Sequence, residues 1–250
     1  MKIVRYSIGQ QIEYGIWEGE RVESLIGEPY QQLKGTKSYH KISDLKLMAP
    51  CTPSKIVAIG LNYYSHAKEM KQPVPSEPIM FFKPSTSVIG PEDKISYPKA
   101  SHRLDYEAEL GVVISHRAWH VSSQEAMKYV LGYTCFNDVT ARDWQNKDSQ
   151  WSRAKGSDTF APTGPCIETE LDPDNVLVES YLNGERKQGA NTNDLVFPVP
   201  ELVSYISHVI TLLPGDIIAT GTPSGIGPMK LGDTIEIKVE NIGTLRNYVA

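Results

Sequence analysis

Two glutamates separated by one residue stand at the entrance to a strongly apolar segment. Glu107 and Glu109 lead into the run 110–114, whose β-branched and apolar residues predict a strand buried on both faces. Side chains two positions apart on a strand share one face and lie about 7 Å apart, so the two carboxylates would project together. A hard divalent cation such as Mg²⁺, Mn²⁺ or Ca²⁺ offsets like charges in such a place. The alternative is a strand end that emerges into solvent with both acids hydrated.

A third carboxylate follows at the end of the next predicted strand. The segment 133–136 is strand-like and leads to Asp138. If the two strands are neighbours, Asp138 joins Glu107 and Glu109 in a three-carboxylate site that suits Mg²⁺ or Mn²⁺ and leaves positions for water and substrate. Taken alone, Asp138 could equally be a loop or cap acid. No cluster of Cys and His has metal-ligand spacing, which argues against zinc.

A histidine and a glutamate three positions apart could supply acid–base chemistry. His66 and Glu69 lie on one face of a predicted short helix at 61–72. A histidine oriented by a carboxylate is a common general base, although the same pair is also common on solvated helices. The prolines at 73–78 force an extended chain, so the helix could act as a movable flap.

Cationic and amide side chains near predicted turns could hold a bound carboxylate or an oxyanion. These side chains are Lys83, Arg142, Gln145 and Lys155. Thr222 stands in a glycine-rich turn whose backbone and hydroxyl could approach a ligand. That turn lacks the phosphate-binding pattern of a nucleotide site. Each of these residues taken singly is most often solvated, so its assignment depends on the rest of the site.

Charge and composition narrow the class of protein. The 250 residues include 30 acidic and 25 basic side chains, a net charge of −5, without a dense Lys/Arg cluster, which argues against a nucleic-acid partner. No apolar run reaches the roughly 18 residues of a membrane span, and the N-terminus is unlike a signal peptide. Cys51, Cys135 and Cys166 have no paired spacing and predict a reducing, cytoplasmic compartment.

The elements that must position these groups are mostly short strands. Alternating segments and glycine turns over 1–52 predict a small β-rich N-terminal appendage, followed by the main domain at 53–250. A capping pattern predicts a helix over 122–131, and an amphipathic pattern predicts another over 200–213. The polar segment 141–160 is expected to be irregular. Because no βαβα alternation is present, we expect a predominantly β, α+β fold.

Together these segments resemble the fumarylacetoacetate hydrolase family over about residues 53–249, in its branch of acylpyruvases and hydroxyheptadienedioate isomerases. The matching stretches are 59–63 with His66 and Glu69, 82–84, 105–110, 132–143, 155–160, 162–165, 182–184 and 215–223. The resemblance implies a mixed β-sandwich roll with a few peripheral helices, usually in a homodimer. It also implies Mg²⁺ or Mn²⁺, with Ca²⁺ as a substitute, on Glu107, Glu109 and Asp138.

The resemblance further implies a lid at 61–72 that closes over a small 2-oxo acid substrate and brings in His66 and Glu69. The positions implied to act in catalysis are His66, Glu69 and Lys155. The positions expected to contact substrate oxygens are Arg142, Gln145, Thr222 and, from its cationic side chain near a turn, Lys83.

The activity expected first is metal-dependent hydrolysis of the C–C bond of an acylpyruvate, a β-diketo acid, through a metal-stabilised pyruvate enolate. The His66–Glu69 dyad would activate water, and Lys155 would stabilise the resulting oxyanion. The same site could instead decarboxylate or isomerise a related keto-diacid, as in aromatic compound catabolism. Examples are oxaloacetate, 2-hydroxyhepta-2,4-diene-1,7-dioate and 5-carboxymethyl-2-hydroxymuconate. More distant alternatives are a two-carboxylate glycosidase and a non-catalytic metal-binding protein.

Overall fold

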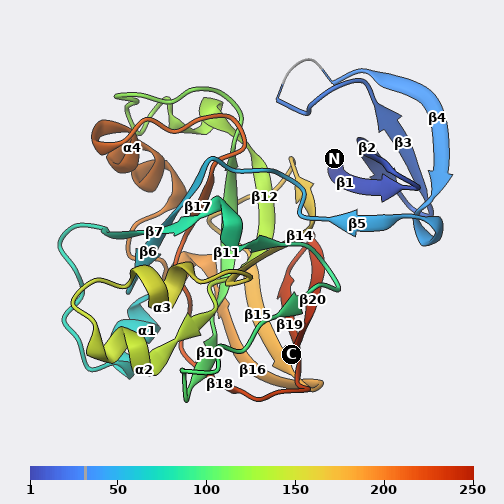
Figure 1. Ribbon diagram of the computed structural model, residues 1–250. Coiled ribbons are helices and arrows are strands. Elements are labelled where there is room, and N and C mark those ends of the chain that lie inside the picture. The colour runs from blue at the N-terminus through green and yellow to red at the C-terminus, as the bar shows by residue number, and fades with distance from the viewer. Residues whose placement is uncertain (31–32) are drawn as a thin grey trace.

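Strands dominate the computed structural model, which describes residues 1–30 and 33–250 (Figure 1). This confirms the expected predominantly β, α+β fold with few helices. The largest sheet of the described residues has 12 strands. Their order is β4 (Gly35–Lys41), β3 (Arg21–Leu25), β2 (Gln11–Glu18), β1 (Lys2–Ile8), β14 (Ala161–Glu168), β12 (Val130–Asn137), β11 (Ala108–Ile114), β17 (Ile217–Ala219), β6 (Lys55–Gly60) and β7 (Ile79–Pro84), with β5 (Lys46–Met48) beside β1 and β8 (Val88–Ile89) beside β14.

Two smaller sheets complete the β structure. One has the order β13 (Thr140–Ala141), β10 (Leu104–Tyr106) and β18 (Gly227–Met229), and the other has the order β16 (Glu185–Asn191), β15 (Leu177–Leu182), β19 (Thr234–Val239), β20 (Gly243–Val249) and β9 (Lys94–Ile95). Asn183 and Gly184 close the β15–β16 hairpin with φ angles of 52° and 81°, a left-handed turn that Asn-Gly adopts readily.

The strand β11 lies at the centre of the molecule. All of its residues are buried, as the apolar run predicted. It pairs antiparallel with β12 on one side and with β17 on the other. Leu110 and Val112 belong to the same apolar cluster as Ile237 and Leu245 of the five-stranded sheet. This packing of two sheets face to face fixes the position of the residues at the start of β11.

The chain leaves one sheet and enters another at two adjacent points. Within the large sheet the β11–β12 ladder ends at the pair Ala108↔Asn137. Beyond it the same two chain segments pair again as β10 and β13, now in the three-stranded sheet. Glu107 and Asp138 stand at this corner, where the Asp138 amide donates to the Glu107 carbonyl at 2.9 Å. At this corner the side chains of Glu107 and Asp138 leave the regular strand pairing, and both reach the same space.

Helices are few and short. They are α1 (Tyr64–Glu69), α2 (Arg142–Lys147), α3 (Ser152–Gly156) and α4 (Val199–Val209), with the 3₁₀ turns η1 (Ile42–Asp44), η2 (Ser85–Ser87), η3 (Ala126–Tyr129) and η4 (Thr192–Asp194). The helices α1, α2 and α3 gather at one end of the sheets, whereas α4 lies at the opposite end (Figure 1).

Three of the local expectations are wrong. The segment 141–160 contains two helices and is not irregular, and the helix expected over 200–213 ends at Val209. The helix expected over 122–131 is only the turn η3, because the strand β12 already begins at Val130. Gly132 lies within β12; a Cβ there would lie 2.4 Å from the Glu168 carbonyl of the neighbouring strand, so the glycine permits close strand packing.

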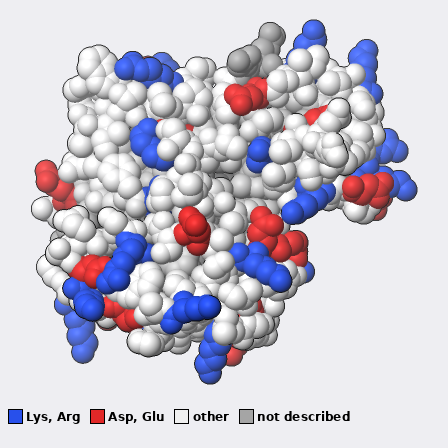
Figure 2. Space-filling view, in the orientation of Figure 1, with Lys and Arg blue, Asp and Glu red and all other residues white. Residues whose placement is uncertain are grey.

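The N-terminal strands β1 to β5 form a lobe beside the main body (Figure 1). The lobe joins the large sheet because β1 pairs with β14 at Lys2↔Glu168 and Ile3↔Ile167. Residues 31 and 32 of the expected appendage lie outside the described residues. Among the described residues, no helix is long and apolar enough to cross a membrane. On the face drawn in Figure 2, basic and acidic side chains are interspersed.

Candidate functional site

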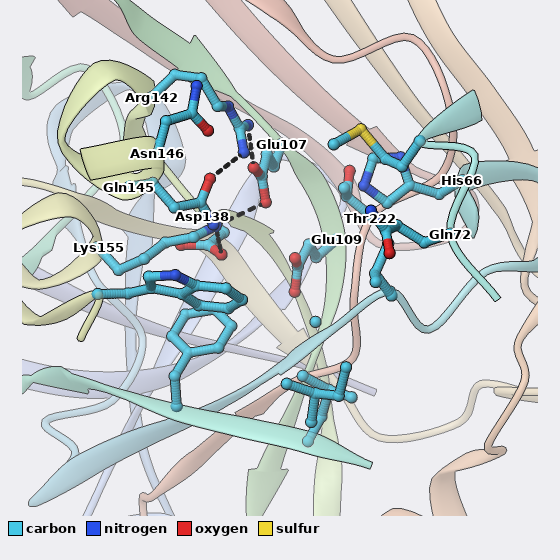
Figure 3. Close-up of a pocket in the computed structure, with 17 residues that line it drawn as sticks. His66, Gln72, Glu107, Glu109, Asp138, Arg142, Gln145, Asn146, Lys155 and Thr222 are labelled. Carbon is cyan, nitrogen blue, oxygen red and sulfur yellow. Dashed lines mark hydrogen bonds and ion pairs between the residues drawn. The ribbon is translucent and has the colours of Figure 1, made fainter. Parts of the chain in front are cut away.

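A pocket of about 390 Å³ opens beside the corner where the chain changes sheets. Short helices and strand ends surround it, and Figure 3 shows its side chains converging from α1, α2, α3 and the acidic corner. Its lining residues are Ile59, Gly60, Leu61, His66, Met70, Gln72, Ile79, Phe81, Glu107, Glu109, Asp138, Arg142, Gln145, Asn146, Trp151, Lys155 and Thr222. Most of the residues expected from sequence to bind metal or substrate are therefore brought together here.

The three carboxylates form the floor of the pocket. Glu107, Glu109 and Asp138 each offer a ligand oxygen, and these oxygens lie within 4.8 Å of one another. All three side chains are buried. The acids thus surround a single point, whereas a glycosidase needs two opposed carboxyl groups that flank a sugar. Three hard oxygen donors around one point match the preference of Mg²⁺ or Mn²⁺.

Two cationic side chains in the pocket neutralise part of this charge. Lys155 Nζ lies 2.9 Å from Glu107 Oε2 and 2.5 Å from Asp138 Oδ2. Arg142 Nη2 binds Glu107 Oε1, and Arg142 Nε donates to buried Asp105 at 2.9 Å. Burial opposes ionisation of Glu107, but Lys155 and Arg142 outweigh it and hold the Glu107 pKa well below its usual range.

Lys83 is the one cation expected at the substrate that the structure places elsewhere. Its side chain is fully buried, and its Nζ binds Asp138 Oδ1 and the Val139 carbonyl, the latter at 3.2 Å. It is not among the described residues that line the pocket. Lys83 lies on β7 and its ammonium reaches Asp138 and Val139. It therefore contacts a candidate metal ligand from outside the set of residues that line the pocket.

Glu109 has the fewest hydrogen-bond and ion-pair partners of the three carboxylates among the described residues. Among the described residues it accepts one hydrogen bond, from the Gly221 amide at 2.9 Å to Oε2. Burial, together with the charges of Asp138 and Glu107, raises the Glu109 pKa well above its usual value. Glu109 is thus a buried carboxylate with one oxygen free of a hydrogen bond to the described residues, and it lies beside two further carboxylates. A divalent cation would fit here, because it would supply the positive charge that these carboxylates need.

The helix α1 places the acid–base pair over the pocket. His66 Nδ1 lies 2.9 Å from Glu69 Oε2, and Glu69 Oε1 accepts from the Gly225 amide at 2.9 Å. The His66 side chain is buried and faces the pocket (Figure 3). Tyr63 provides no side-chain cap for the helix. Instead, Asp194 Oδ2 accepts from the Ser65 amide at 3.0 Å, which satisfies a free N-terminal amide.

Several pocket residues carried no clear signal in the sequence. Gln72 and Asn146 add amide groups, while Trp151 packs edge-on against Phe81 with ring centroids 5.4 Å apart. Their side chains are of types that are usually solvated or part of a core, and nothing in local spacing separates them from such residues. Asp105 stands two residues before Glu107 in the sequence, on β10, and that proximity was the available signal for its contact with Arg142.

The sequence matches two family models that divide the chain between them. The model described as fumarylacetoacetate (FAA) hydrolase C-terminal matches residues 55–250. A second, described as Rv2993c-like, N-terminal, matches residues 1–50.

Named relatives and solved structures resemble the chain over most of its length. Oxaloacetate tautomerase FAHD2B, mitochondrial, of Bos taurus is 41% identical over 220 residues, which span 83% of this chain and 70% of that protein. The crystal structure of 5-carboxymethyl-2-hydroxymuconate delta-isomerase from Mycobacterium smegmatis has a TM-score of 0.95 at 40% identity, covering 100% of this chain and 99% of the other. The structure of 2-hydroxyhepta-2,4-diene-1,7-dioate isomerase from Mycobacterium marinum has a TM-score of 0.94 at 38% identity, covering 100% and 98%.

Proposed function

Because the chain belongs to the fumarylacetoacetate hydrolase family, we propose that it is a divalent-metal-dependent tautomerase or isomerase of a small 2-oxo acid. The observation that carries the proposal is the His66–Glu69 pair on α1 facing a buried three-carboxylate cluster across one pocket. Relatives named as an oxaloacetate tautomerase and as isomerases of unsaturated keto-diacids support this reaction class.

Glu107, Glu109 and Asp138 would hold the cation. When bound, Mg²⁺ or Mn²⁺ would supply Lewis acidity to the carboxylate and 2-oxo oxygens of the substrate, which makes the neighbouring C–H bond more acidic. The chain then has to orient the substrate, move one proton and limit access of water.

His66 is suited to move that proton. An ionised Glu69 carboxylate can only accept a hydrogen bond, so the His66 Nδ1 that faces it carries the hydrogen, and Nε2 keeps its lone pair. Nε2 can therefore take a proton from the carbon beside the 2-oxo group and return a proton to another position of the same molecule. The Gly225 amide fixes the second oxygen of Glu69, which holds the pair in one orientation.

The remaining polar groups would bind the substrate. Lys155 points to the same space as the carboxylates and would stabilise negative charge on a substrate oxygen. Gln145, Asn146 and Gln72 offer amide donors and acceptors around the rim. Arg142 already bonds to Asp105 and Glu107, so its main effect would be on the orientation of Glu107.

Hydrolysis of an acylpyruvate C–C bond remains the second candidate. The dyad that supports tautomerisation could also activate a water molecule, and Lys155 could then stabilise the oxyanion formed at the attacked carbonyl. Decarboxylation of oxaloacetate would need neither water nor the dyad. The three reactions give different products from known 2-oxo acids, so they can be separated directly.

The test uses protein stripped with EDTA and then supplied with Mg²⁺ or Mn²⁺. Enol oxaloacetate prepared in an aprotic solvent would be followed by loss of its ultraviolet absorbance, acetylpyruvate by acetate release, and oxaloacetate by CO₂ release. We expect metal-dependent loss of the enol signal that falls at least 100-fold in His66→Ala and is unchanged in the exposed control His102→Ala. Acetate or CO₂ as the dominant product would replace tautomerisation with hydrolysis or decarboxylation.

A further inference from the structure

Two histidines meet at the end of the molecule that lies opposite the pocket. The ring centroids of His120 and His208 are 5.0 Å apart, and the ring planes cross at 79°. His208 belongs to α4, which lies at the other end of the sheets from α1, α2 and α3 (Figure 1). Both residues are exposed. Because they are far apart along the chain, only the fold brings them together, and no spacing pattern in the sequence could indicate the pair.

Backbone hydrogen bonds fix the segment that carries His120 against α4. The His120 amide donates to the Ser207 carbonyl at 3.0 Å, and the Val121 amide donates to Ser207 Oγ at 2.9 Å. Ala118 and Leu212 exchange two further backbone hydrogen bonds of 3.0 Å each. Since Ser207 directly precedes the second histidine in the chain, the two imidazoles project from backbone segments that are bonded to each other.

A contact on each ring restrains its orientation. His208 Nδ1 lies 2.8 Å from the Ser204 carbonyl, which can only accept, so in the neutral ring Nδ1 carries the hydrogen and Nε2 keeps its lone pair. A carbonyl bound in this way fixes the tautomer of many metal-binding histidines and leaves the second nitrogen as the ligand. His120 packs edge-on against Trp119, with ring centroids 4.5 Å apart. The pair is therefore partly organised to receive a cation.

The distance between the rings fits one metal ion between them. With metal–nitrogen distances of about 2.0–2.1 Å in a tetrahedral arrangement, the centres of two imidazoles on one Zn²⁺ lie roughly 5 Å apart, and the observed separation is 5.0 Å. Imidazole nitrogens suit Zn²⁺, Ni²⁺ and Cu²⁺, whereas Mg²⁺ prefers oxygen ligands. Among the described residues, the carboxylates of the pocket are the one cluster of three or more such ligands, so an ion on the histidine pair would complete its coordination with water.

We propose that His120 and His208 form a second cation site, which takes a divalent transition-metal ion such as Zn²⁺ or Ni²⁺ and not Mg²⁺. The chain would then have two sites of different chemistry, with carboxylate oxygens in the pocket and imidazole nitrogens beside α4. An ion on the pair would link the segment 118–121 to α4 and stabilise this end of the fold. The site takes no part in the proposed reaction, because it lies at the opposite end of the molecule.

The affinity test is a calorimetric titration with Ni²⁺ in excess Mg²⁺, which competes for the carboxylates. We expect one equivalent of Ni²⁺ to bind to wild-type protein. Loss of a partner that only orients a ligand costs about 10- to 100-fold in metal affinity, so loss of a ligand in His120→Ala or His208→Ala should weaken Ni²⁺ binding at least about tenfold. The exposed control His102→Ala should bind as the wild type does. Glu109→Gln, which weakens the carboxylate site, should also keep this equivalent.

The indole NMR signals of two tryptophans locate the bound ion. Trp119 contacts His120, whereas Trp151 lines the pocket. Paramagnetic Ni²⁺ on the histidine pair should broaden the Trp119 signal first and leave the Trp151 signal sharp. In His208→Ala this selective broadening of Trp119 should disappear. Both histidine variants should retain wild-type turnover with Mg²⁺, because neither residue lies at the pocket.

Three results would each overturn the inference. One is Ni²⁺ affinity that is unchanged in both histidine variants. Another is affinity that falls in only one of them, because a single exposed histidine would then hold the ion. The third is broadening of Trp151 before Trp119, with binding lost in Glu109→Gln, because the ion would then lie on the carboxylates. None of these results contradicts the proposed function, which is tested by turnover with Mg²⁺ or Mn²⁺.

Discussion

The Lys155 ammonium lies 2.9 Å from Oε2 of the Glu107 carboxylate and, at 2.5 Å, also bonds to Asp138. It therefore bridges two of the three groups that would hold a divalent cation. Although burial opposes its charge, Asp138 and Glu107 raise the Lys155 pKa above its usual value. Lys155 is thus charged at neutral pH, and it bonds to oxygens that would also ligate a cation.

Replacing this lysine should separate metal binding from turnover. In Lys155→Met the competing charge is gone, so we expect Mn²⁺ to bind several-fold more tightly in calorimetric titration. Turnover should fall about 100-fold, because a donor to the charged substrate oxygen is lost. Arg153→Met is the matched control, since this residue of the same helix is exposed and pairs with Asp148. Weaker Mn²⁺ binding in Lys155→Met would mean that the lysine helps to build the metal site.

Glu109→Gln should abolish most of the metal response. Glu109 is the ligand with the fewest protein contacts, and the amide is nearly isosteric with the acid, so the fold should be retained. We expect Mg²⁺ and Mn²⁺ affinity to fall at least about tenfold. EDTA should lower the melting temperature of the wild type more than that of the variant, because a cation at 100 times its Kd adds about 2.7 kcal/mol of stability and one at 10 times its Kd adds about 1.4 kcal/mol. The control is Glu125→Gln, because Glu125 is exposed and its ion pair with Lys128 lies on the surface.

The three cysteines should make the protein sensitive to alkali but not to thiol reagents. Burial raises the pKa of Cys51 and of Cys166 to about 12, and it raises the pKa of Cys135 as well. In the unfolded chain a thiol ionises near pH 8.5. Ionisation therefore favours the unfolded state as pH rises above that value, by about 1.4 kcal/mol per thiol at pH 9.5.

The measurement is urea unfolding at several pH values between 7.5 and 10. The free energy of unfolding should be constant up to about pH 8 and should then decline. The thiols should react with reagents only in urea, where unfolding exposes them. Iodoacetamide at pH 8 should leave all three cysteines unmodified in the folded protein. Rapid alkylation of Cys51 under native conditions would show that its environment opens far more often than its complete burial indicates.

The sequence predicts the fold class and the acidic pattern because both depend on local periodicity. Alternation along one strand is enough to place Glu107 and Glu109 on a common face, and the apolar run after them predicts burial. The corner between β10 and β11 depends on which strands pair far along the chain. No local pattern contains that information. The sequence could therefore predict that Asp138 lies near Glu107 only on the condition that their strands are neighbours.

One of the errors in local structure lies at the site itself. The segment 141–160 was expected to be irregular because its residues are polar, yet α2 and α3 turn Arg142 and Lys155 inward to meet buried acids. Such a helix has its charged side chains toward the core, which reverses the usual pattern. Lys83 and Gln188 illustrate the same limit, since their partners Asp138 and Ala108 lie far away along the chain and are found only in three dimensions.

The helix α1 should loosen when its N-terminal hydrogen bond is removed. Asp194 from η4 accepts from the Ser65 amide, and a bond of this kind contributes about 1 kcal/mol. Asp194→Ala should therefore raise the open population of α1 about fivefold. Trypsin should cleave after the exposed Lys68 and Lys71 faster by the same factor, because cleavage follows the open population when opening and closing are fast.

The same variant should leave substrate binding and chemistry close to those of the wild type. If α1 must be closed for His66 to reach the substrate, KM rises only in proportion to the loss of the closed population, so KM and kcat both stay near the wild-type values while the closed form predominates. Asp174→Ala, an exposed aspartate in another loop, is the control. Added Mg²⁺ with a 2-oxo acid should slow cleavage in wild type and variant alike. Unchanged cleavage in Asp194→Ala would show that Glu69 and Gly225 hold the lid without help from this bond.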